Sequence, residues 1–461
     1  MRADPDRAQP TARRDPLPGS IAAGRPRFIR HNLGHVLAVM RLLRDPAYYA
    51  ERTLARYVAA HPRLGSSDRA AIGDLVFALV RWRRRIDRAI ELATPGSAAP
   101  PSGDVAVLLA CGALLRTAGY ADEVILDAVA AAAPEPLPPG ADAWIATAAE
   151  ALVGLDPNAA TDATDLASRA SLPEWVVARL VRQYGWARAR AIAVASRERA
   201  PAVLRINALR TTRADVIAAL AREGIAAHPT ALSPWGVVLD EPVSLHGSSL
   251  TRDGLVEFQD EGSQLVALAA GARPGMRVVD ACAGAGGKTL ALAAAMEDRG
   301  EIIALDVDRA KLDELRRRAA RAGATIVRTS RPSAGADLVL VDAPCSGSGT
   351  WRRIPDGPWH LAPDDVARHA ERQREILSRY ASLVRPGGRL VYATCSIFAE
   401  ENEDVVTRLL AERPDFALCP ATEALPADVA SLVAEGPYLA LTPDRHGTDG
   451  FFVAIMERTK P

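Results

Sequence analysis

The chain has 461 residues, which is enough for about three domains at roughly 100 to 200 residues each. Lysines and arginines together number 56 and equal the 56 aspartates and glutamates, so the net charge gives no hint of a polyanionic partner and any basic surface must be local. The five cysteines are an odd number without paired spacing, which excludes a disulfide framework. Because the sequence shows neither a signal peptide nor an apolar run of about 18 residues, we expect a cytoplasmic protein with reduced cysteines.

The N-terminal third of the chain has a helical pattern. Residues 1–27 are basic and proline-rich without an apolar period, which predicts a disordered tail. From 28 to 155, apolar residues recur at spacings of three and four, as in Val36, Leu37 and Met40, which predicts an all-α domain. The arginines of 81–88 are equally consistent with a solvated helix face and with contacts to RNA phosphates. Residues 156–199 continue the helical pattern as a linker.

Residues 200–258 change to an alternation of strand, helix and strand. The sequence predicts one strand over 203–207 and another over 236–239, which together make a small α/β unit. Arg205 and Asn207 lie on the same face of the first strand because side chains alternate along a strand. That face is either solvated or holds a nucleic-acid backbone.

Residues 259–461 alternate between short apolar strands and helices. Such an order is typical of an α/β fold with a doubly wound, Rossmann-like parallel sheet. The predicted strands are 276–279, 302–305, 338–341 and 390–393.

A glycine-rich turn, Asp280–Thr289, follows the first of these strands and opens a helix. A Walker loop would need glycine in place of Cys282, and a dinucleotide fingerprint that starts at Gly284 would need glycine or alanine in place of Thr289. The next strand ends at Asp306, whose carboxylate can accept hydrogen bonds from both hydroxyls of a ribose. These features predict a site for a nucleoside without phosphates, and S-adenosylmethionine is the common one.

Two cysteines follow apolar runs at the points where strands leave the sheet. Cys345 stands in Pro-Cys-Ser after 338–341, and Cys395 stands in Thr-Cys-Ser after 390–393. A single free cysteine is usually a small buried hydrophobe. However, the carboxyl ends of parallel strands form the ligand crevice of such a sheet. We therefore interpret the pair as a two-cysteine site that faces one substrate.

Thiols at a nucleoside site favour one reaction, the methylation of cytosine at carbon 5. Carbon 5 is too weak a nucleophile to take a methyl group, but a thiolate that adds to carbon 6 turns the ring into an enamine whose carbon 5 can attack a sulfonium methyl. A base must then remove the proton from carbon 5 so that the thiolate can leave. Asp342, in the same loop as Cys345, is placed to manage charge near ring nitrogen 3.

These motifs resemble a known family. The segments Asp280–Thr289, Asp342–Thr350 and Tyr392–Ser396, with the Glu-Glu-Asn-Glu run at 400–403, are similar to the signature motifs of the Sun-type RNA (cytosine-5) methyltransferases, above all the bacterial 16S ribosomal RNA enzymes. The resemblance covers nearly the whole chain. It includes N-terminal helices similar to the NusB antitermination factor, the segments Ser171–Trp175 and Arg205–Asn207, and the closing His446–Phe452.

The resemblance implies roles for individual residues. Cys395 would be the nucleophile, Cys345 would assist release of the methylated base, and Asp342 would lie where cofactor and cytosine meet. S-adenosylmethionine would be the cofactor, and its contacts would be Cys282, Ala283, Gly284, Ala285, Gly286, Gly287, Lys288, Asp306 and Asp342.

Lys288 is one of only three lysines in a chain that otherwise uses arginine. It stands at a helix start, where the helix dipole disfavours a cation. We therefore predict that a compact ammonium group is required beside cofactor or substrate, and a solvated helix start is the alternative.

The implied partner is RNA, with ribosomal RNA favoured. Because chemistry on a base needs a flipped nucleotide whose flanks are held, we expect RNA contacts from the helical domain and from Arg205, Asn207, Arg352 and Arg353. We expect a monomer that needs neither metal nor membrane.

The sequence departs from the family pattern in two places. The usual Ala-Ala-Pro of the glycine turn is Ala283–Ala285, and residues 329–331 after the predicted strand 325–328 lack the usual adenine-facing aspartate. The adenine contact is thus unassigned. Two other classes of protein remain as alternatives, a non-enzymatic RNA-binding scaffold and an NAD-dependent oxidoreductase.

Overall fold

The computed structural model describes residues 26–94, 101, 103–241, 243–245, 247–332 and 335–459. The chain divides into two compact units. The first contains the described residues up to Arg199 together with 351–360, and the second contains the described parts of 200–350 and of 361–461. Most of the predicted tail, residues 1–25, lies outside the described residues, and the first helix begins at Pro26.

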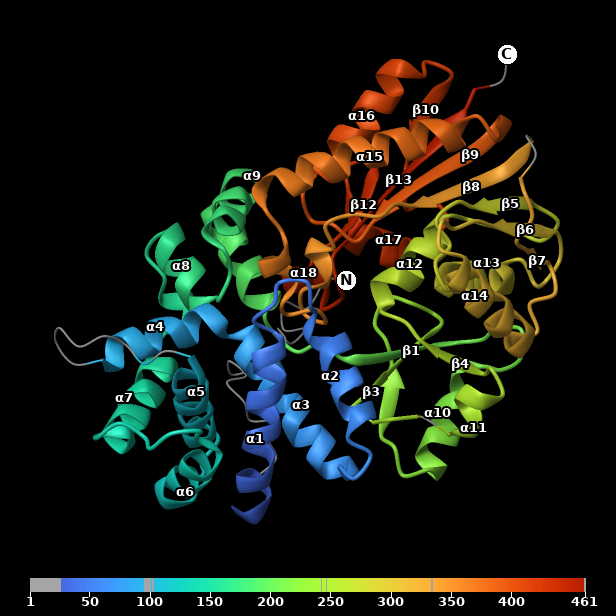
Figure 1. Ribbon diagram of the computed structural model, residues 1–461. Helices are drawn as coiled ribbons and strands as arrows, with labels where there is room; N and C mark the ends of the chain where they lie inside the picture. The colour runs from blue at the N-terminus through green and yellow to red at the C-terminus, as the bar shows by residue number, and fades with distance from the viewer. Residues whose placement is uncertain are drawn as a thin grey trace, which may run out of the picture. The chain divides into compact units, whose positions relative to one another are not determined.

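The first unit is a helical bundle, which confirms the predicted all-α region (Figure 1). Its helices are α1 (Pro26–Leu42), α2 (Ala50–Ala60), α3 (Ser66–Arg81), α4 (Arg83–Ala93), α5 (Gly103–Thr117), α6 (Asp122–Ala132), α7 (Ala141–Gly154), η1 (Pro157–Ala159), α8 (Ala163–Arg169) and α9 (Glu174–Ala195).

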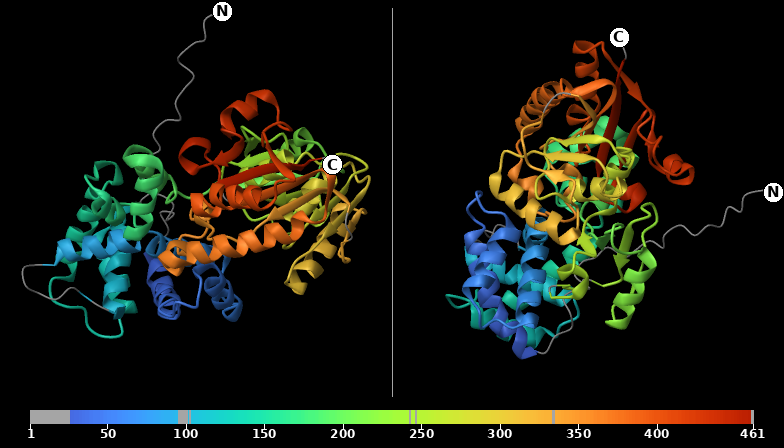
Figure 2. Two further views of the ribbon diagram at one scale, coloured as in Figure 1. Left: turned by 90° about the horizontal axis from the view of Figure 1, so that it is seen from above. Right: turned by 90° about the vertical axis from the view of Figure 1, so that its right-hand side faces the viewer.

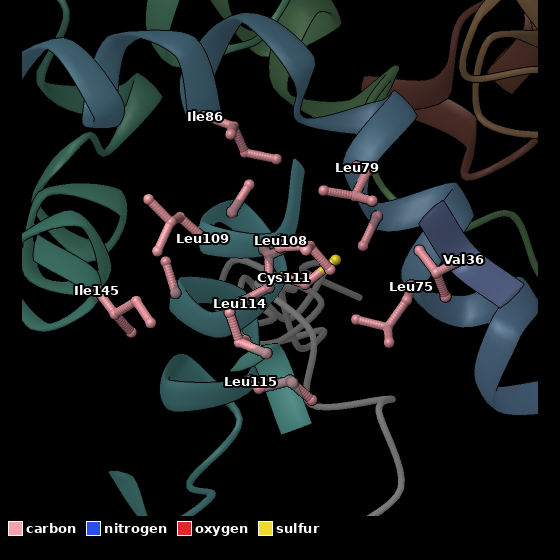
Figure 3. Close-up of a cluster of buried hydrophobic side chains, with 14 of the residues drawn as sticks. Val36, Leu75, Leu79, Ile86, Leu108, Leu109, Cys111, Leu114, Leu115 and Ile145 are labelled. Carbon is pink, nitrogen blue, oxygen red and sulfur yellow. The ribbon is translucent and has the colours of Figure 1, made fainter. Parts of the chain in front are cut away.

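Helix α5 lies at the centre of this unit. Every residue from Leu108 to Leu115 is buried, as expected for a helix that is apolar on all sides. Side chains of α1, α3, α4 and α7 point towards it (Figure 3). Burial raises the pKa of the Cys111 thiol to about 12, so this cysteine is a packing residue.

The segment 351–360, which follows the Cys345 loop in sequence, packs within the helical unit. Helix α2 has no side-chain cap of its own, and the buried carboxylate of Asp356 accepts a hydrogen bond from the Ala50 amide at 2.6 Å. The guanidinium of Arg197 donates to the carbonyl of Pro355 at 3.0 Å. The sequence predicted this segment as part of the 259–461 region, since its partners in the helical unit lie far away along the chain and leave no local pattern.

The second unit begins with a small antiparallel sheet of order β2-β3-β1-β4. The strands are β1 (Ala202–Ile206), β2 (Ala227–Pro229), β3 (Gly236–Leu239) and β4 (Val256–Phe258), with helices α10 (Arg213–Arg222) and α11 (Ser249–Arg252). This is the predicted small α/β unit.

A larger mixed sheet follows and confirms the doubly wound, Rossmann-like prediction. Within the described residues its order is β11-β12-β13-β9-β8-β5-β6-β7, with β10 paired to β13. The strands are β5 (Arg277–Asp280), β6 (Glu301–Ala304), β7 (Val327–Arg328), β8 (Ala336–Asp342), β9 (Val384–Thr394), β10 (Phe416–Cys419), β11 (Ala434–Glu435), β12 (Tyr438–Leu441) and β13 (Phe451–Arg458). Strands β5 to β9 are parallel, and β13 runs antiparallel beside β9. Figure 2 shows the ribbon from two further sides.

Helices cover both faces of the large sheet (Figure 1). Successive side chains of a strand point to opposite faces of the sheet, so the sheet separates two hydrophobic cores. Val278 packs with a first set of helices on one face and Val279 with a second set on the other. The first set is α12 (Glu261–Ala269), α13 (Gly287–Ala295), α14 (Arg309–Ala322) and α17 (Ala427–Val433), and the second is α15 (Pro363–Ala381) and α16 (Glu403–Glu412). The short elements are η2 (Ser348–Thr350), η3 (Gly357–His360), η4 (Ala399–Glu401) and α18 (Pro443–His446). None of the helices in the described part of the chain is long and apolar enough to cross a bilayer.

Candidate active site

The two predicted cysteines meet at one edge of the large sheet. Strands β8 and β9 are parallel neighbours, with Asp342 in register with Ala393, so the loops that follow them leave the sheet side by side. The Sγ atoms of Cys345 and Cys395 are 3.3 Å apart. Because β5 pairs with both β6 and β8, the order of the strands reverses here, which is where open α/β sheets bind ligands.

An ion pair lies beside the thiols. The ammonium of Lys288 donates to the Asp342 carboxylate at 2.7 Å and lies 5.3 Å from the ring centroid of Phe451. Burial acts to lower the pKa of Lys288, but the charge and hydrogen bond of Asp342 outweigh it and raise that pKa, with a further contribution from Cys395. The structure thus brings Lys288, Asp342 and both thiols together, although they come from three separate motifs.

The glycine turn joins β5 to α13. Gly286 has φ +90°, and a β-carbon there would lie 2.7 Å from the side chain of Leu315, so only glycine fits without displacement. The hydroxyl of Thr289 donates to the buried carboxylate of Asp280 at 2.7 Å. Burial raises the pKa of Asp280 to about 7, and the hydroxyl opposes that rise.

Two arginines hold the carbonyl groups of the turn. Arg318 donates to the carbonyl of Ala285 at 2.7 Å and is itself paired with Glu257 at 3.0 Å. Arg205 donates to the carbonyl of Gly287 at 2.5 Å. These bonds hold the backbone of the turn in one conformation. The turn is therefore pre-organised for a ligand.

Asp306 lies after β6, facing the glycine turn. One oxygen of its carboxylate accepts the Gly284 amide at 2.9 Å, and the other accepts the Asp308 amide at 2.8 Å. The next residue, Val307, is 93% exposed, which is unusual for a valine at the end of a buried strand. Val307 was not predicted from the sequence, where its only signal is its place directly after the predicted ribose carboxylate.

Cys282 is the third cysteine near this site. Burial, followed by the negative charges of Asp280 and Asp342, raises the pKa of its thiol to about 12. Such a thiol is protonated at neutral pH and is a poor nucleophile.

The residues expected to contact RNA are mostly buried. Arg205 is 3% exposed and Asn207 is 6% exposed, and Asn207 donates to two carbonyl oxygens of neighbouring segments at 2.8 and 2.9 Å. Arg352 is buried in the helical unit, and its carbonyl accepts a hydrogen bond from Arg81 at 3.0 Å. Of the four predicted residues only Arg353 is exposed. The alternation of side chains along β1 places Arg205 and Asn207 on one face of the strand. It does not show whether solvent or the rest of the unit covers that face.

Glu401, like Val307, is a functional candidate that sequence reasoning did not single out. It is fully buried, and its carboxylate accepts hydrogen bonds from both cysteine loops. Its signal was the acidic run 400–403 after the Thr-Cys-Ser motif, but the sequence did not show which member of the run points inward. Among the described residues, no group of three or more His, Cys, Asp and Glu side chains is arranged to hold a metal ion.

Two family models match the chain. Residues 267–457 match the family described as 16S rRNA methyltransferase RsmB/F, and residues 172–246 match the ferredoxin-like domain of RsmF/B-like methyltransferases.

Two relatives are similar to this chain over more than half of its length. A probable ribosomal RNA small subunit methyltransferase B of Bacillus subtilis is 36% identical over 304 residues, which are 64% of this chain and 68% of that protein. Ribosomal RNA small subunit methyltransferase B of Vibrio cholerae is 32% identical over 303 residues, 63% of this chain and 66% of that protein. The alignments thus span about two thirds of each relative.

Solved structures share the fold. The crystal structure of PH0851 superposes with a TM-score of 0.71 at 25% identity and covers 95% of this chain and 99% of that one. A methyltransferase homolog protein from Pyrococcus horikoshii has a TM-score of 0.55 at 29% identity and covers 65% of this chain and 99% of its own. Both the helical and the α/β units therefore have counterparts in known structures.

Proposed function

The chain belongs to the RsmB/F family of methyltransferases, and from this premise we propose that it methylates carbon 5 of a cytosine in the RNA of the small ribosomal subunit. S-adenosylmethionine is its cofactor. The observation that carries the proposal is the pair of thiols 3.3 Å apart at the strand ends, with the Lys288–Asp342 ion pair beside them. Family membership argues against the two alternatives, an RNA-binding scaffold without activity and an NAD-dependent oxidoreductase.

The residues around the glycine turn fit S-adenosylmethionine. Asp306 offers carboxylate oxygens to ribose hydroxyls, and the exposed Val307 beside it suits the flat face of an adenine. The turn Cys282–Lys288 would hold the rest of the cofactor, with Asp342 at the boundary to the cytosine. When bound, the cofactor supplies an electrophilic methyl group on a sulfonium.

The cysteines would then carry the chemistry. Cys395 as thiolate adds to carbon 6 of the cytosine, which breaks the double bond between carbons 5 and 6 and makes carbon 5 nucleophilic. The Lys288–Asp342 pair would supply a proton or a hydrogen bond to ring nitrogen 3, where negative charge develops as the thiolate adds. Once carbon 5 carries the methyl group, a general base would accept the proton from carbon 5, and the electron pair of that C–H bond would re-form the double bond as the bond from carbon 6 to Cys395 breaks. Cys345, adjacent to Cys395, assists this release.

Release of hydrogen from carbon 5 tests the reaction. With small-subunit RNA that carries tritium on carbon 5 of its cytosines, we expect tritium to appear in water in the same amount as methyl groups enter the RNA, because carbon 5 exchanges its hydrogen for the methyl group. RNA labelled at carbon 6 is the control and should retain its tritium. Methyl transfer without release from carbon 5 would contradict the proposal.

Asp306→Ala should weaken cofactor binding far more than catalysis. Charge-assisted hydrogen bonds contribute about 1.5–3 kcal/mol each, so the loss of both bonds to the ribose should raise the Kd for S-adenosylmethionine by at least about 100-fold, with kcat at saturating cofactor nearly unchanged. Asp306→Asn should be intermediate because it keeps one acceptor oxygen. Titration calorimetry measures the affinity, and Asp308→Ala, two residues away, is the control. An unchanged Kd for Asp306→Ala would remove this residue from the cofactor site.

A further inference from the structure

Each cysteine of the site is followed by a serine, and both serines bond to one carboxylate. The hydroxyls of Ser346 and Ser396 each donate to Oε2 of Glu401 at 2.5 Å. The two hydroxyl oxygens are themselves 3.4 Å apart. A single oxygen atom therefore joins the loop that carries Cys345 to the loop that carries Cys395.

The second oxygen of Glu401 is also fully used. Oε1 accepts the backbone amide of Ser346 at 2.8 Å and the side-chain amide of Gln373 at 2.9 Å. Gln373 belongs to α15 and donates as well to the carbonyl of Pro344 at 3.0 Å, directly before Cys345. With four donors and no exposed surface, the carboxylate has the hydrogen bonds that a buried charge requires.

The backbone of Glu401 is fixed to the sheet. The hydroxyl of Tyr392, in β9, donates to the Glu401 carbonyl at 2.5 Å, and the side-chain oxygen of Gln373 lies 3.1 Å from the same hydroxyl. Tyr392 is fully buried. The carboxylate is therefore a rigid point to which two irregular loops are bound, rather than a mobile partner.

The spacing of the two thiols matters for the chemistry. Both sulfurs have to reach one cytosine ring, and a misplacement of about 1 Å can reduce a rate by about 100-fold. Other hydrogen bonds also join the two cysteine loops, among them the bond of the Gly349 amide to the Cys395 carbonyl and the contacts of Ser348. Glu401 differs from these because it binds both residues that directly follow the cysteines. The Glu401 charge also contributes to the raised pKa of Cys345, after the hydrogen bond from Cys395, burial and the Cys395 charge.

We propose that Glu401 is a positioning residue that sets the distance between Cys345 and Cys395 by binding Ser346 and Ser396 through one carboxylate oxygen. The inference rests on the proposed two-cysteine reaction for its catalytic meaning. The positioning itself can be measured without any turnover.

Capture of the thiol pair by a trivalent arsenical tests the positioning. Phenylarsine oxide forms bonds to two sulfurs at once and resists competition by a monothiol only when both sulfurs are close together. We expect the wild-type protein to hold one arsenical across Cys345 and Cys395, and Glu401→Ala to bind it at least about tenfold more weakly, as measured by intact mass. Cys345→Ala should lose the capture, and Asp404→Ala, an exposed carboxylate nearby, is the matched control.

Kinetics and a conservative variant separate positioning from general structural support. Glu401→Ala should lower kcat by about 100-fold and leave the KM for S-adenosylmethionine unchanged. Glu401→Gln should recover much of the kcat and much of the arsenical capture, because its side-chain amide can accept from the Ser346 backbone amide and donate to the serine hydroxyls. If Glu401→Ala fails to fold, the double variant Ser346→Ala/Ser396→Ala removes both donors and should reproduce the weakened capture.

The outcomes distinguish this inference from the proposed function. Undiminished arsenical capture in folded Glu401→Ala, or in the double serine variant, would overturn the positioning role whatever the RNA product is. Weakened capture together with absent tritium release by the wild type would support the positioning role and refute the cytosine reaction.

Discussion

Cys395→Ala will abolish methyl transfer without trapping RNA, whereas Cys345→Ala will accumulate a covalent enzyme–RNA complex. If Cys395 attacks carbon 6, its removal prevents the adduct, and the rate should fall by at least about 1,000-fold, as for other essential nucleophiles. If Cys345 serves only in release, its variant still attacks and transfers the methyl group but stalls before elimination. A denaturing gel of each variant with small-subunit RNA and S-adenosylmethionine should show a slow-migrating protein–RNA band for Cys345→Ala alone.

The two variants test the roles of the cysteines directly, because the sulfurs are 3.3 Å apart and either one can reach the same ring. Cys419→Ala is the control, since Cys419 lies on β10, away from this edge of the sheet, and should behave as the wild type. A band for Cys395→Ala and none for Cys345→Ala would exchange the two roles. Full turnover in both variants would refute the thiolate mechanism.

Gly349→Ala will cost about 3 kcal/mol or more of unfolding free energy and most of the activity. The Gly349 amide donates to the Cys395 carbonyl at 2.8 Å, and its own carbonyl accepts the Gly450 amide at 2.8 Å. A β-carbon at position 349 would lie 2.2 Å from the Gly450 carbonyl oxygen, and backbone cannot yield as a flexible side chain can. Separating the two segments would also displace Cys395.

Chemical denaturation followed by circular dichroism measures this loss, and tritium release measures the activity. The matched control is Gly347→Ala in the same loop, where φ is +68° and the nearest atom to a β-carbon is 3.5 Å away. That variant should lose only about 1–2 kcal/mol, from the backbone conformation alone. Equal losses for the two glycines would show that strain in the loop, and not the close approach to Gly450, makes Gly349 necessary.

The sequence by itself was sufficient for the features that depend on local order. Apolar spacing predicted the helical region, and the alternation of strands with helices predicted the Rossmann-like sheet, because each pattern reflects which face of an element is buried. The meeting of Cys345 with Cys395 followed from their places after two strands, since parallel strands end at a common edge. The rarity of lysine in the chain and the place of Lys288 in the glycine turn predicted an ammonium group beside cofactor or substrate, and the structure pairs this group with Asp342.

Only the tertiary structure decided which polar groups are buried and what they bind. From the sequence, the strand face that carries Arg205 and Asn207 could contact either RNA or protein. In the structure both side chains donate hydrogen bonds to backbone carbonyl oxygens that lie far away in sequence. Asp356 caps a helix that precedes it by 306 residues, which places 351–360 in the helical unit. Glu401 joins two loops through a hydrogen-bond network that reaches α15. Such roles depend on partners far away in sequence, and a side-chain hydrogen bond, unlike an apolar face, produces no periodic pattern along the chain.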